Sequence, residues 1–147
     1  MVKIALRSIL VVCTGNICRS PVGERLLRRQ LPDLTVDSAG TYGLTGEAAD
    51  TTASEVAARN GLSLDGHIAQ KLTASLARNY DLILVMEPLH IEQVTKISPE
   101  ARGKVMLFGQ WIGKKEVPDP YKKSHEAHQH VFDMLTTASQ EWAKRLS

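Results

Sequence analysis

The sequence has few cysteines, and this shortage excludes one class of protein. Only two occur among 147 residues, Cys13 and Cys18. A disulfide between positions so close in sequence would staple little of a domain of this size. The pattern of a disulfide-stabilised secreted domain is therefore missing. We expect a reducing compartment, the cytoplasm, and a chemical role for the thiols.

The sequence also lacks an excess of one charge and any long apolar segment. Its 18 basic and 16 acidic residues are mixed along the chain and give a net charge of +2. Nucleic-acid and membrane surfaces are typically bound by clustered basic residues, so neither partner is expected. The apolar run Ile9–Val12 is too short for an export signal, and no later stretch approaches the length needed to cross a membrane. We predict a cytoplasmic protein without direct membrane insertion.

The order of apolar segments predicts one α/β domain spanning residues 1–147. Its 43% hydrophobic content suffices for one core, and the chain is too short for two good ones. Runs typical of buried strands alternate with helical patterns, which favours a parallel sheet covered on both faces. The first helix is predicted to begin near Ser20 as a cap, with Pro21 in the first helical position. The expected strands are 9–13, 35–39, 82–86 and 105–108, and the later helices are 51–60, 88–97 and a final one with an apolar stripe from Ala127 to Leu146.

The most informative segment is Cys13–Ser20, CTGNICRS, between the first strand and the first helix. Ligands of parallel sheets lie beyond the carboxyl ends of the strands. A loop that leads into a helix offers backbone N–H groups and the positive end of the helix dipole to an anion. Gly15 permits the turns that such a loop needs, and the Arg19 guanidinium can hold two oxygens of one phosphate. The segment therefore predicts a phosphate site.

The same environment stabilises a thiolate at Cys13. A thiolate at the floor of a phosphate site faces phosphorus, and in-line attack would give a cysteinyl-phosphate. The segment is not a nucleotide-binding P-loop, because it lacks the second glycine and the lysine of that motif. In the alternative interpretation Cys13 is a core cysteine and Arg19 a surface charge. That alternative does not explain why Gly15 and Asn16 separate the strand from the helix. It also does not explain why the helix begins with Arg19-Ser20-Pro21.

The segment resembles the C-x5-R-S loop of the low-molecular-weight protein tyrosine phosphatases. Further segments occur in the family order: Asp37-Ser-Ala-Gly40, Gly66-His67, Asp81 to Glu87 and Asp119-Pro-Tyr121. The resemblance implies a three-layer fold with a four-stranded parallel sheet in the order 2-1-3-4. It also implies phosphotyrosine hydrolysis without a cofactor or metal ion. Gly23 departs from the family pattern, which more often has alanine there.

The resemblance also implies roles for single residues. The phosphate would be bound by Thr14, Gly15, Asn16, Ile17, Cys18, Arg19 and Ser20. Ser20 would donate to the Cys13 thiolate, while Asn16, Ser38 and His67 would support the loop. For His67, ordinary surface polarity is an equally good interpretation. Cys18 could form a reversible disulfide with Cys13 or simply fill space.

Asp119 lies in Val117-Pro-Asp-Pro-Tyr121, where the flanking prolines restrict the backbone. Asp-Pro alone indicates only a turn. The resemblance makes Asp119 the general acid of the first step and the general base of the second. Tyr121, Tyr42 and Leu44 are expected to line the entrance, although each could serve packing instead. His125, His128 and His130 cannot converge from one helix, so we expect no metal site.

Two segments, ARGKVMLFGQW from Ala101 and VPDPYKKS from Val117, resemble the bacterial branch associated with exopolysaccharide or capsule production. In that branch the substrate is typically an autophosphorylated membrane tyrosine kinase, which is therefore the expected partner. Two alternatives remain open. A thioredoxin-coupled arsenate reductase would relay oxidation through further cysteines, and none follows Cys18. A non-catalytic phosphate-binding protein would not need Asp119.

Overall fold

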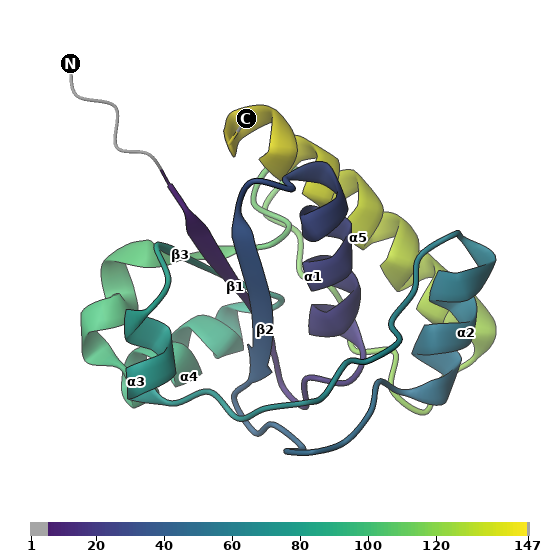
Figure 1. Cartoon of the computed structure of the whole chain (residues 1–147), viewed down its shortest axis with the longest axis horizontal. Helices are drawn as coiled ribbons and strands as arrows, with labels where there is room; N and C mark the ends of the chain where they lie inside the picture. The colour runs from purple at the N-terminus through teal and green to yellow at the C-terminus, as the bar shows by residue number, and fades with distance from the viewer. Residues whose placement is uncertain (1–5, 147) are drawn as a thin grey trace.

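The computed structural model describes residues 6–146, and its centre is a parallel sheet (Figure 1). The strands are β1 (Ser8–Cys13), β2 (Thr35–Gly40), β3 (Leu82–Val85) and β4 (Val105–Leu107), in the order β2-β1-β3-β4. All three pairings are parallel. The predicted fold class and strand order are confirmed.

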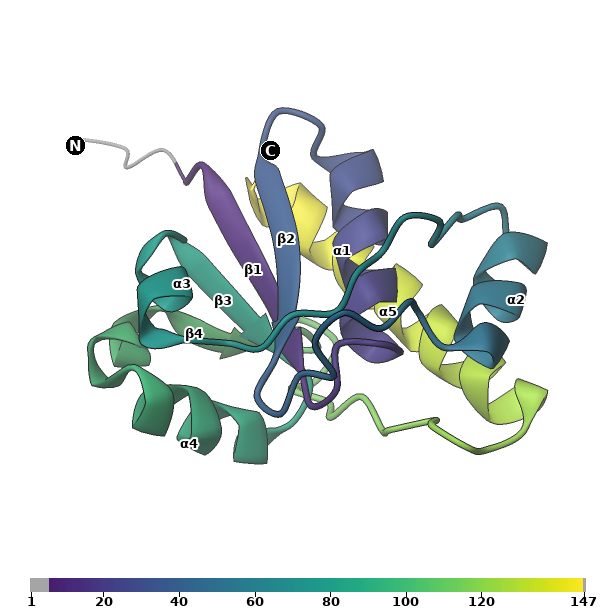
Figure 2. The same cartoon turned by 60° about the horizontal axis from the view of Figure 1, so that its bottom comes forward.

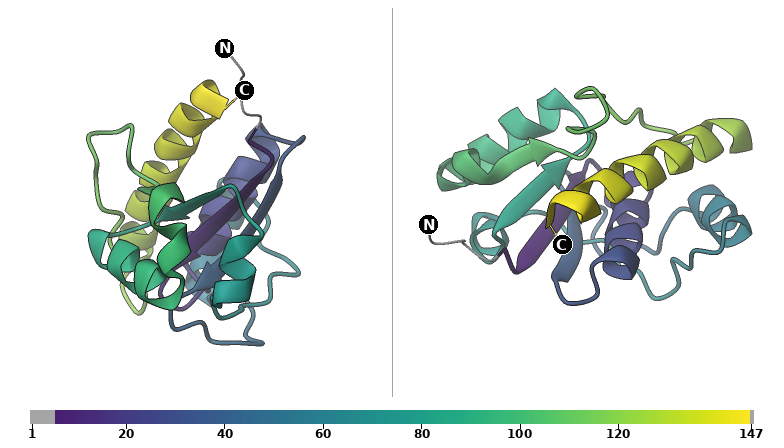
Figure 3. Two further views of the ribbon diagram at one scale, coloured as in Figure 1. Left: turned by 90° about the vertical axis from the view of Figure 1, so that its left-hand side faces the viewer. Right: turned by 90° about the horizontal axis from the view of Figure 1, so that it is seen from above.

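Helices cover both faces of the sheet, which explains why its central strands are apolar on both sides (Figures 1 and 2). In β1, Ile9 and Val11 belong to the apolar cluster shared with helices α1 (Arg19–Gln30) and α5 (His125–Leu146). Leu10 and Val12 belong to a second cluster, shared with α3 (Ala74–Arg78) and α4 (Pro88–Ile97). Figure 3 shows these helices on opposite sides of the sheet. Burial on both faces accounts for the uninterrupted apolar run.

Helix α5 carries the predicted apolar stripe, since Val131, Leu135, Ala138 and Trp142 are all buried. It packs against α1 and also against α2 (Thr51–Arg59). Gly61 follows α2, where it adopts a left-handed backbone with a φ of +77°. Among the helices of residues 6–146, none is both long enough and apolar enough to span a bilayer.

Two local predictions differ from the structure. Ser20 does not cap α1, because the helix already begins at Arg19 and Ser20 is buried inside its first turn. Pro21 is accordingly the third helical residue. The short helix α3 and the 3-10 helix η1 (Pro99–Lys104) were not predicted. Both are too short to establish a helical period in the sequence.

Packing explains why this chain has glycine at position 23, where the family more often has alanine. A Cβ atom at this position would lie 3.0 Å from Cε2 of Phe108 and 3.2 Å from Cγ1 of Val11. Phe108 and Val11 are fully buried in the cluster beneath α1. The absence of a side chain at Gly23 thus lets α1 lie close to β1, directly behind the loop 13–20.

We expect Gly23→Val to lower the free energy of unfolding by about 2 kcal/mol or more, because two further methyl groups would enter a filled core. Urea unfolding followed by circular dichroism measures the change. Arg29→Val is the matched control, since Arg29 is exposed on the same helix. Valine has the higher helix propensity of the two residues at position 23, so a loss no larger than that of Arg29→Val would contradict the packing explanation.

Candidate active site

The loop 13–18 turns its carbonyl groups outward. The carbonyl oxygens of residues 13, 14 and 15 accept hydrogen bonds from the backbone N–H groups of Thr41, Tyr42 and Leu44, at 2.9, 3.0 and 3.0 Å. The carbonyl of Ile17 accepts from the N–H of Asp50 at 2.9 Å. The carbonyl oxygen of Asn16 lies 2.6 Å from Nε2 of His67. Five consecutive carbonyls are thus held by the surrounding chain.

The orientation of these carbonyls fixes the orientation of the amides. In a planar trans peptide the C=O and the following N–H point in opposite directions, and the described residues contain no cis peptide. The N–H groups of residues 14–18 therefore point away from the surrounding chain. Among the backbone hydrogen bonds of residues 6–146 outside the regular elements, none is donated by these five amides. They remain available to an anion on the inner side of the loop.

A pocket of about 190 Å³ lies on that inner side. The strand end supplies Cys13, and the start of α1 supplies Arg19, so the positive end of the helix dipole faces the same space. Of the residues predicted to bind phosphate, Asn16 and Ser20 do not line the pocket and are buried. The lining residues are Cys13, Thr14, Gly15, Ile17, Cys18, Arg19, Leu44, Asp119 and Tyr121.

Asn16 holds the loop in its shape. It adopts the left-handed backbone region, with a φ of 60°, which asparagine tolerates better than most residues. Its side-chain Nδ2 donates to Ser20 Oγ at 2.7 Å and to Ser38 Oγ at 3.0 Å. Its Oδ1 accepts from the backbone N–H of Gln70 at 2.9 Å. The structure thus brings the four predicted loop-supporting residues, Asn16, Ser20, Ser38 and His67, into one network.

The network also directs a proton toward the sulfur. Ser38 Oγ donates to Glu24 Oε1 at 2.9 Å, so the proton of this hydroxyl is engaged. Ser20 Oγ accepts a hydrogen bond from Asn16 and lies 2.9 Å from Cys13 Sγ. The Ser20 hydroxyl proton is therefore left to point at the sulfur. A hydrogen bond donated to a thiolate stabilises its charged form.

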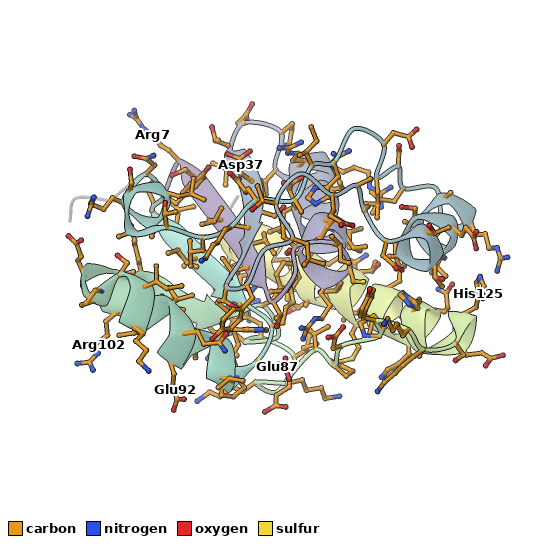
Figure 4. The ribbon with its side chains drawn as sticks, turned by 90° about the horizontal axis from the view of Figure 1, so that it is seen from below. Arg7, Asp37, Glu87, Glu92, Arg102 and His125 are labelled. Carbon is orange, nitrogen blue, oxygen red and sulfur yellow. The ribbon has the colours of Figure 1, made fainter. Side chains whose placement is uncertain are left out.

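Arg19 is a buried cation, with a side chain 2% exposed, held by partners from two other loops. Its Nη1 donates to Glu87 Oε2 at 2.8 Å and to the carbonyl oxygen of Val117 at 2.9 Å. Glu87 lies at the N-terminus of α4, on the edge of the molecule seen in Figure 4. These bonds fix the plane of the guanidinium at the pocket wall and use only one of its nitrogens.

Asp119 lies at the mouth of the same pocket. Its Oδ2 is 3.8 Å from Arg19 Nη2, and its side chain is 51% exposed. Its Oδ1 accepts from the backbone N–H of Tyr121 at 3.0 Å, which fixes the turn. The preceding Val117 donates its N–H to the carbonyl of Met86 at 2.9 Å and so anchors this loop to the end of β3. An acid is therefore positioned above the floor formed by Cys13.

The two cysteines have different environments, and both are free thiols. Burial raises the pKa of the Cys18 thiol strongly, and the nearby carboxylate of Asp50 adds to the effect. Cys18 therefore stays protonated at neutral pH. Of the two sulfurs at this pocket, Cys13 is the one with a hydroxyl partner that can stabilise a thiolate.

The three predicted entrance residues are distributed over two pockets. Leu44 and Tyr121 line the pocket of Cys13, where an aromatic ring could pack between them. Tyr42 is 66% exposed and lines a neighbouring pocket instead. A role for Tyr42 at the entrance stays a prediction.

His90 is a site residue that was not predicted from the sequence. This histidine is buried, and its Nδ1 accepts from the backbone N–H of Glu87 at 3.2 Å. The remaining ring proton therefore lies on Nε2, which donates to Thr14 Oγ1 at 2.9 Å. His90 thus links α4 to the loop. The Glu87-Pro88-Leu89-His90 capping box would have been the signal for it.

The buried position of His90 predicts a pH dependence of stability. Burial, with a contribution from the nearby Arg19, lowers the pKa of His90 from 6.5 to about 4. Between these two values the unfolded chain binds more protons than the folded one, so stability falls as the pH falls from 6.5 towards 4. We expect His90 to contribute roughly 2 to 3 kcal/mol to this loss. Below pH 4 its contribution should change no further.

Urea unfolding at several pH values measures the effect, and His90→Gln should flatten the curve in this window. His130→Gln is the control, because His130 is exposed on α5. Some slope should remain from His128, whose pKa is also lowered by burial. An unchanged slope in His90→Gln would contradict the assignment.

Comparison with known proteins agrees with this geometry. The family model described as low molecular weight phosphotyrosine protein phosphatase matches residues 8–147. The chain is 65% identical over 147 residues to the low molecular weight protein-tyrosine-phosphatase Etp of Escherichia coli K12. The alignment covers 100% of this chain and 99% of that protein.

Two solved structures are similar over nearly the whole chain. Vibrio vulnificus Wzb in complex with benzylphosphonate has a TM-score of 0.95 and 53% identity, over 97% of this chain and 100% of that one. The tyrosine phosphatase Wzb from Escherichia coli K30 in complex with sulphate has a TM-score of 0.95 and 56% identity, over 97% of this chain and 99% of that one. By sequence and by fold, this chain belongs to the low molecular weight phosphotyrosine protein phosphatase family.

Proposed function

We propose that this protein hydrolyses phosphotyrosine in proteins through a cysteinyl-phosphate on Cys13. The observation that carries the proposal is the set of five outward carbonyls at residues 13–17, which leaves five amides on the side of the pocket. These amides and the unused N–H groups of Arg19 would bind the three non-bridging oxygens of the phosphate. The benzylphosphonate bound by the Vibrio relative combines an aromatic ring with a tetrahedral phosphonate, which supports the same ligand class here.

In the first step, the Cys13 thiolate attacks phosphorus in line with the leaving phenolic oxygen. The S–P bond forms while the P–O bond to tyrosine breaks. Asp119, protonated at this stage, transfers its proton to the departing oxygen. A tyrosine side chain has a pKa near 10, so its departure as an anion would be slow without this proton. The amides and Arg19 stabilise the charge that is spread over the three equatorial oxygens.

In the second step, water attacks the phosphorus of the cysteinyl-phosphate. Asp119, now a carboxylate, takes a proton from this water, and the S–P bond breaks to restore the thiolate. Inorganic phosphate leaves. Ser20 stabilises the sulfur as it becomes anionic again, because its hydroxyl lies 2.9 Å away.

Turnover of p-nitrophenyl phosphate in the presence of EDTA tests the activity. We expect full activity, because every group in the proposed steps belongs to the chain. Loss of turnover in EDTA would contradict the mechanism. Arsenate-dependent oxidation of thioredoxin would instead support an arsenate reductase, and phosphate binding without turnover would support a binding protein.

We further propose that the substrate is an autophosphorylated membrane tyrosine kinase involved in exopolysaccharide or capsule production, met in the cytoplasm. Support comes from the two segments beginning at Ala101 and Val117, which resemble that bacterial branch. Asp119→Ala should still bind the substrate while hydrolysing it slowly, so it serves as bait. We expect it to capture a phosphotyrosine-containing kinase from lysate, and excess inorganic phosphate should prevent the capture. Capture of only phosphate-free proteins would contradict this substrate.

A further inference from the structure

A second pocket of about 220 Å³ adjoins the one described above. Three parts of the chain form it. They are the segment after β2, Lys71, which pairs with Gly40 at the end of that strand, and the second half of α4. Its lining residues are Thr41, Tyr42, Lys71, Gln93, Lys96 and Ile97. None of these takes part in the steps proposed for phosphotyrosine hydrolysis.

Two of the lining residues carry buried polar atoms that have no hydrogen-bond partner among the described residues. One is Oγ1 of Thr41, a residue only 3% exposed, and the other is Oε1 of Gln93. A buried polar atom that lacks a hydrogen bond is costly, and such atoms are few in folded proteins. The Thr41 hydroxyl can donate to a ligand. The Gln93 amide can do so too, because rotating it exchanges its oxygen and nitrogen. A rotation that turns either group toward the pocket would give it a polar ligand as its missing partner.

The charge of the second pocket indicates an anion. Lys71 and Lys96 line it, and both are exposed. Neither lysine belongs to an ion pair among residues 6–146. Glu92, the acidic neighbour of Gln93, points outward from α4 (Figure 4). Two cations and two hydrogen-bonding groups therefore line one hollow.

The second pocket is coupled to the active-site loop through the chain itself. Thr41 and Tyr42 donate their backbone N–H groups to the carbonyls of Cys13 and Thr14. Gln93 lies one turn along α4 from His90, which contacts Thr14. On the other side of this segment, Leu44 lines the pocket of Cys13. Tyr42 and Leu44, two residues apart, thus line the two different pockets, so one polypeptide can contact both.

We infer that the second pocket selects substrates by binding an anionic side chain of the same polypeptide, a carboxylate or a second phosphate, close to the phosphotyrosine. This inference rests on the proposed phosphatase activity and names a feature of its substrates. The volume of the second pocket is similar to that of the pocket of Cys13, so it can accept a side chain as large as the one that is hydrolysed. Tyr42 and Ile97 supply apolar contact for the stem of that side chain.

The test compares kcat/KM for phosphotyrosine peptides that carry either Glu or Gln at the positions flanking the phosphotyrosine. A further peptide carries the non-hydrolysable phosphonomethyl-phenylalanine in place of Glu, which distinguishes a phosphate-like ligand from a carboxylate. We expect the wild type to prefer an anionic peptide over the Gln peptide by about fivefold at low salt, the sum of two modest exposed ion pairs. Rising ionic strength should reduce the preference.

In the double variant Lys71→Ala/Lys96→Ala we expect the preference to disappear, while p-nitrophenyl phosphate and the Gln peptide are turned over as before. Lys144→Ala, which removes an exposed lysine of α5, is the matched control and should keep the preference. Absence of the preference in the wild type, or its survival in the double variant, would overturn the inference and leave the phosphatase activity standing. Absence of turnover of p-nitrophenyl phosphate in the wild type would overturn both.

Discussion

Replacing Cys13 by serine should lower kcat for p-nitrophenyl phosphate by on the order of 10⁴-fold or more. The loop stabilises a thiolate through Ser20, and no described residue within hydrogen-bonding distance of Sγ could act as a base for a serine hydroxyl. The serine side chain would thus stay protonated and attack poorly. Steady-state assays with purified protein measure the loss.

The Cys13→Ser variant should still bind inorganic phosphate, because the amides of residues 14–18 and Arg19 are unchanged. Equilibrium dialysis against phosphate serves as the control for folding of the loop. Normal turnover by this variant would contradict the proposed nucleophile. Loss of phosphate binding together with turnover would show that the substitution had damaged the loop.

Replacing Asp119 by alanine should produce a loss that depends on the leaving group. For tyrosyl phosphate we expect kcat/KM, which reports the steps up to formation of the cysteinyl-phosphate, to fall by roughly 10²- to 10³-fold, because general acid catalysis typically contributes this much. For p-nitrophenyl phosphate the fall in kcat/KM should be much smaller, since p-nitrophenolate leaves without needing a proton. The ratio of the two losses is the quantity to measure. Asp119 is half exposed at the pocket mouth, so the substitution should leave the fold intact.

Asp133→Ala is the matched control, because Asp133 is an exposed carboxylate of α5 outside the pocket. It should turn over both substrates at the wild-type rate. Equal losses for both leaving groups in Asp119→Ala would contradict proton donation by Asp119. That result would assign this carboxylate a role in holding Arg19, which lies 3.8 Å away.

The parallel fold and the position of the loop could be predicted because their signals are local. The run Ile9–Val12 is buried on both faces of the sheet, and a sequence shows that directly as unbroken apolarity. The spacing of Cys13, Gly15 and Arg19 is likewise contained in one short segment. The helix start was misjudged because Ser20 satisfies the usual capping preference, yet its hydroxyl is used by the sulfur instead.

Some residues that reach the site from distant segments were not predicted. Glu87 and His90 follow β3, some 70 residues after the loop, and only the parallel pairing of β1 with β3 brings them to Arg19 and Thr14. Glu24 has the sequence appearance of a solvated helix residue, but it is buried and accepts from Ser38. Such contacts depend on tertiary structure, which a single sequence does not display.

The most direct test of the account is to isolate the cysteinyl-phosphate. In Asp119→Ala, p-nitrophenyl phosphate should still react with Cys13, while hydrolysis of the intermediate should be slow because its general base is missing. Rapid acid quenching followed by peptide mass spectrometry should find one added phosphoryl group on Cys13, together with a burst of about one equivalent of nitrophenol. No burst, or a phosphoryl group on any other residue, would contradict the central claim.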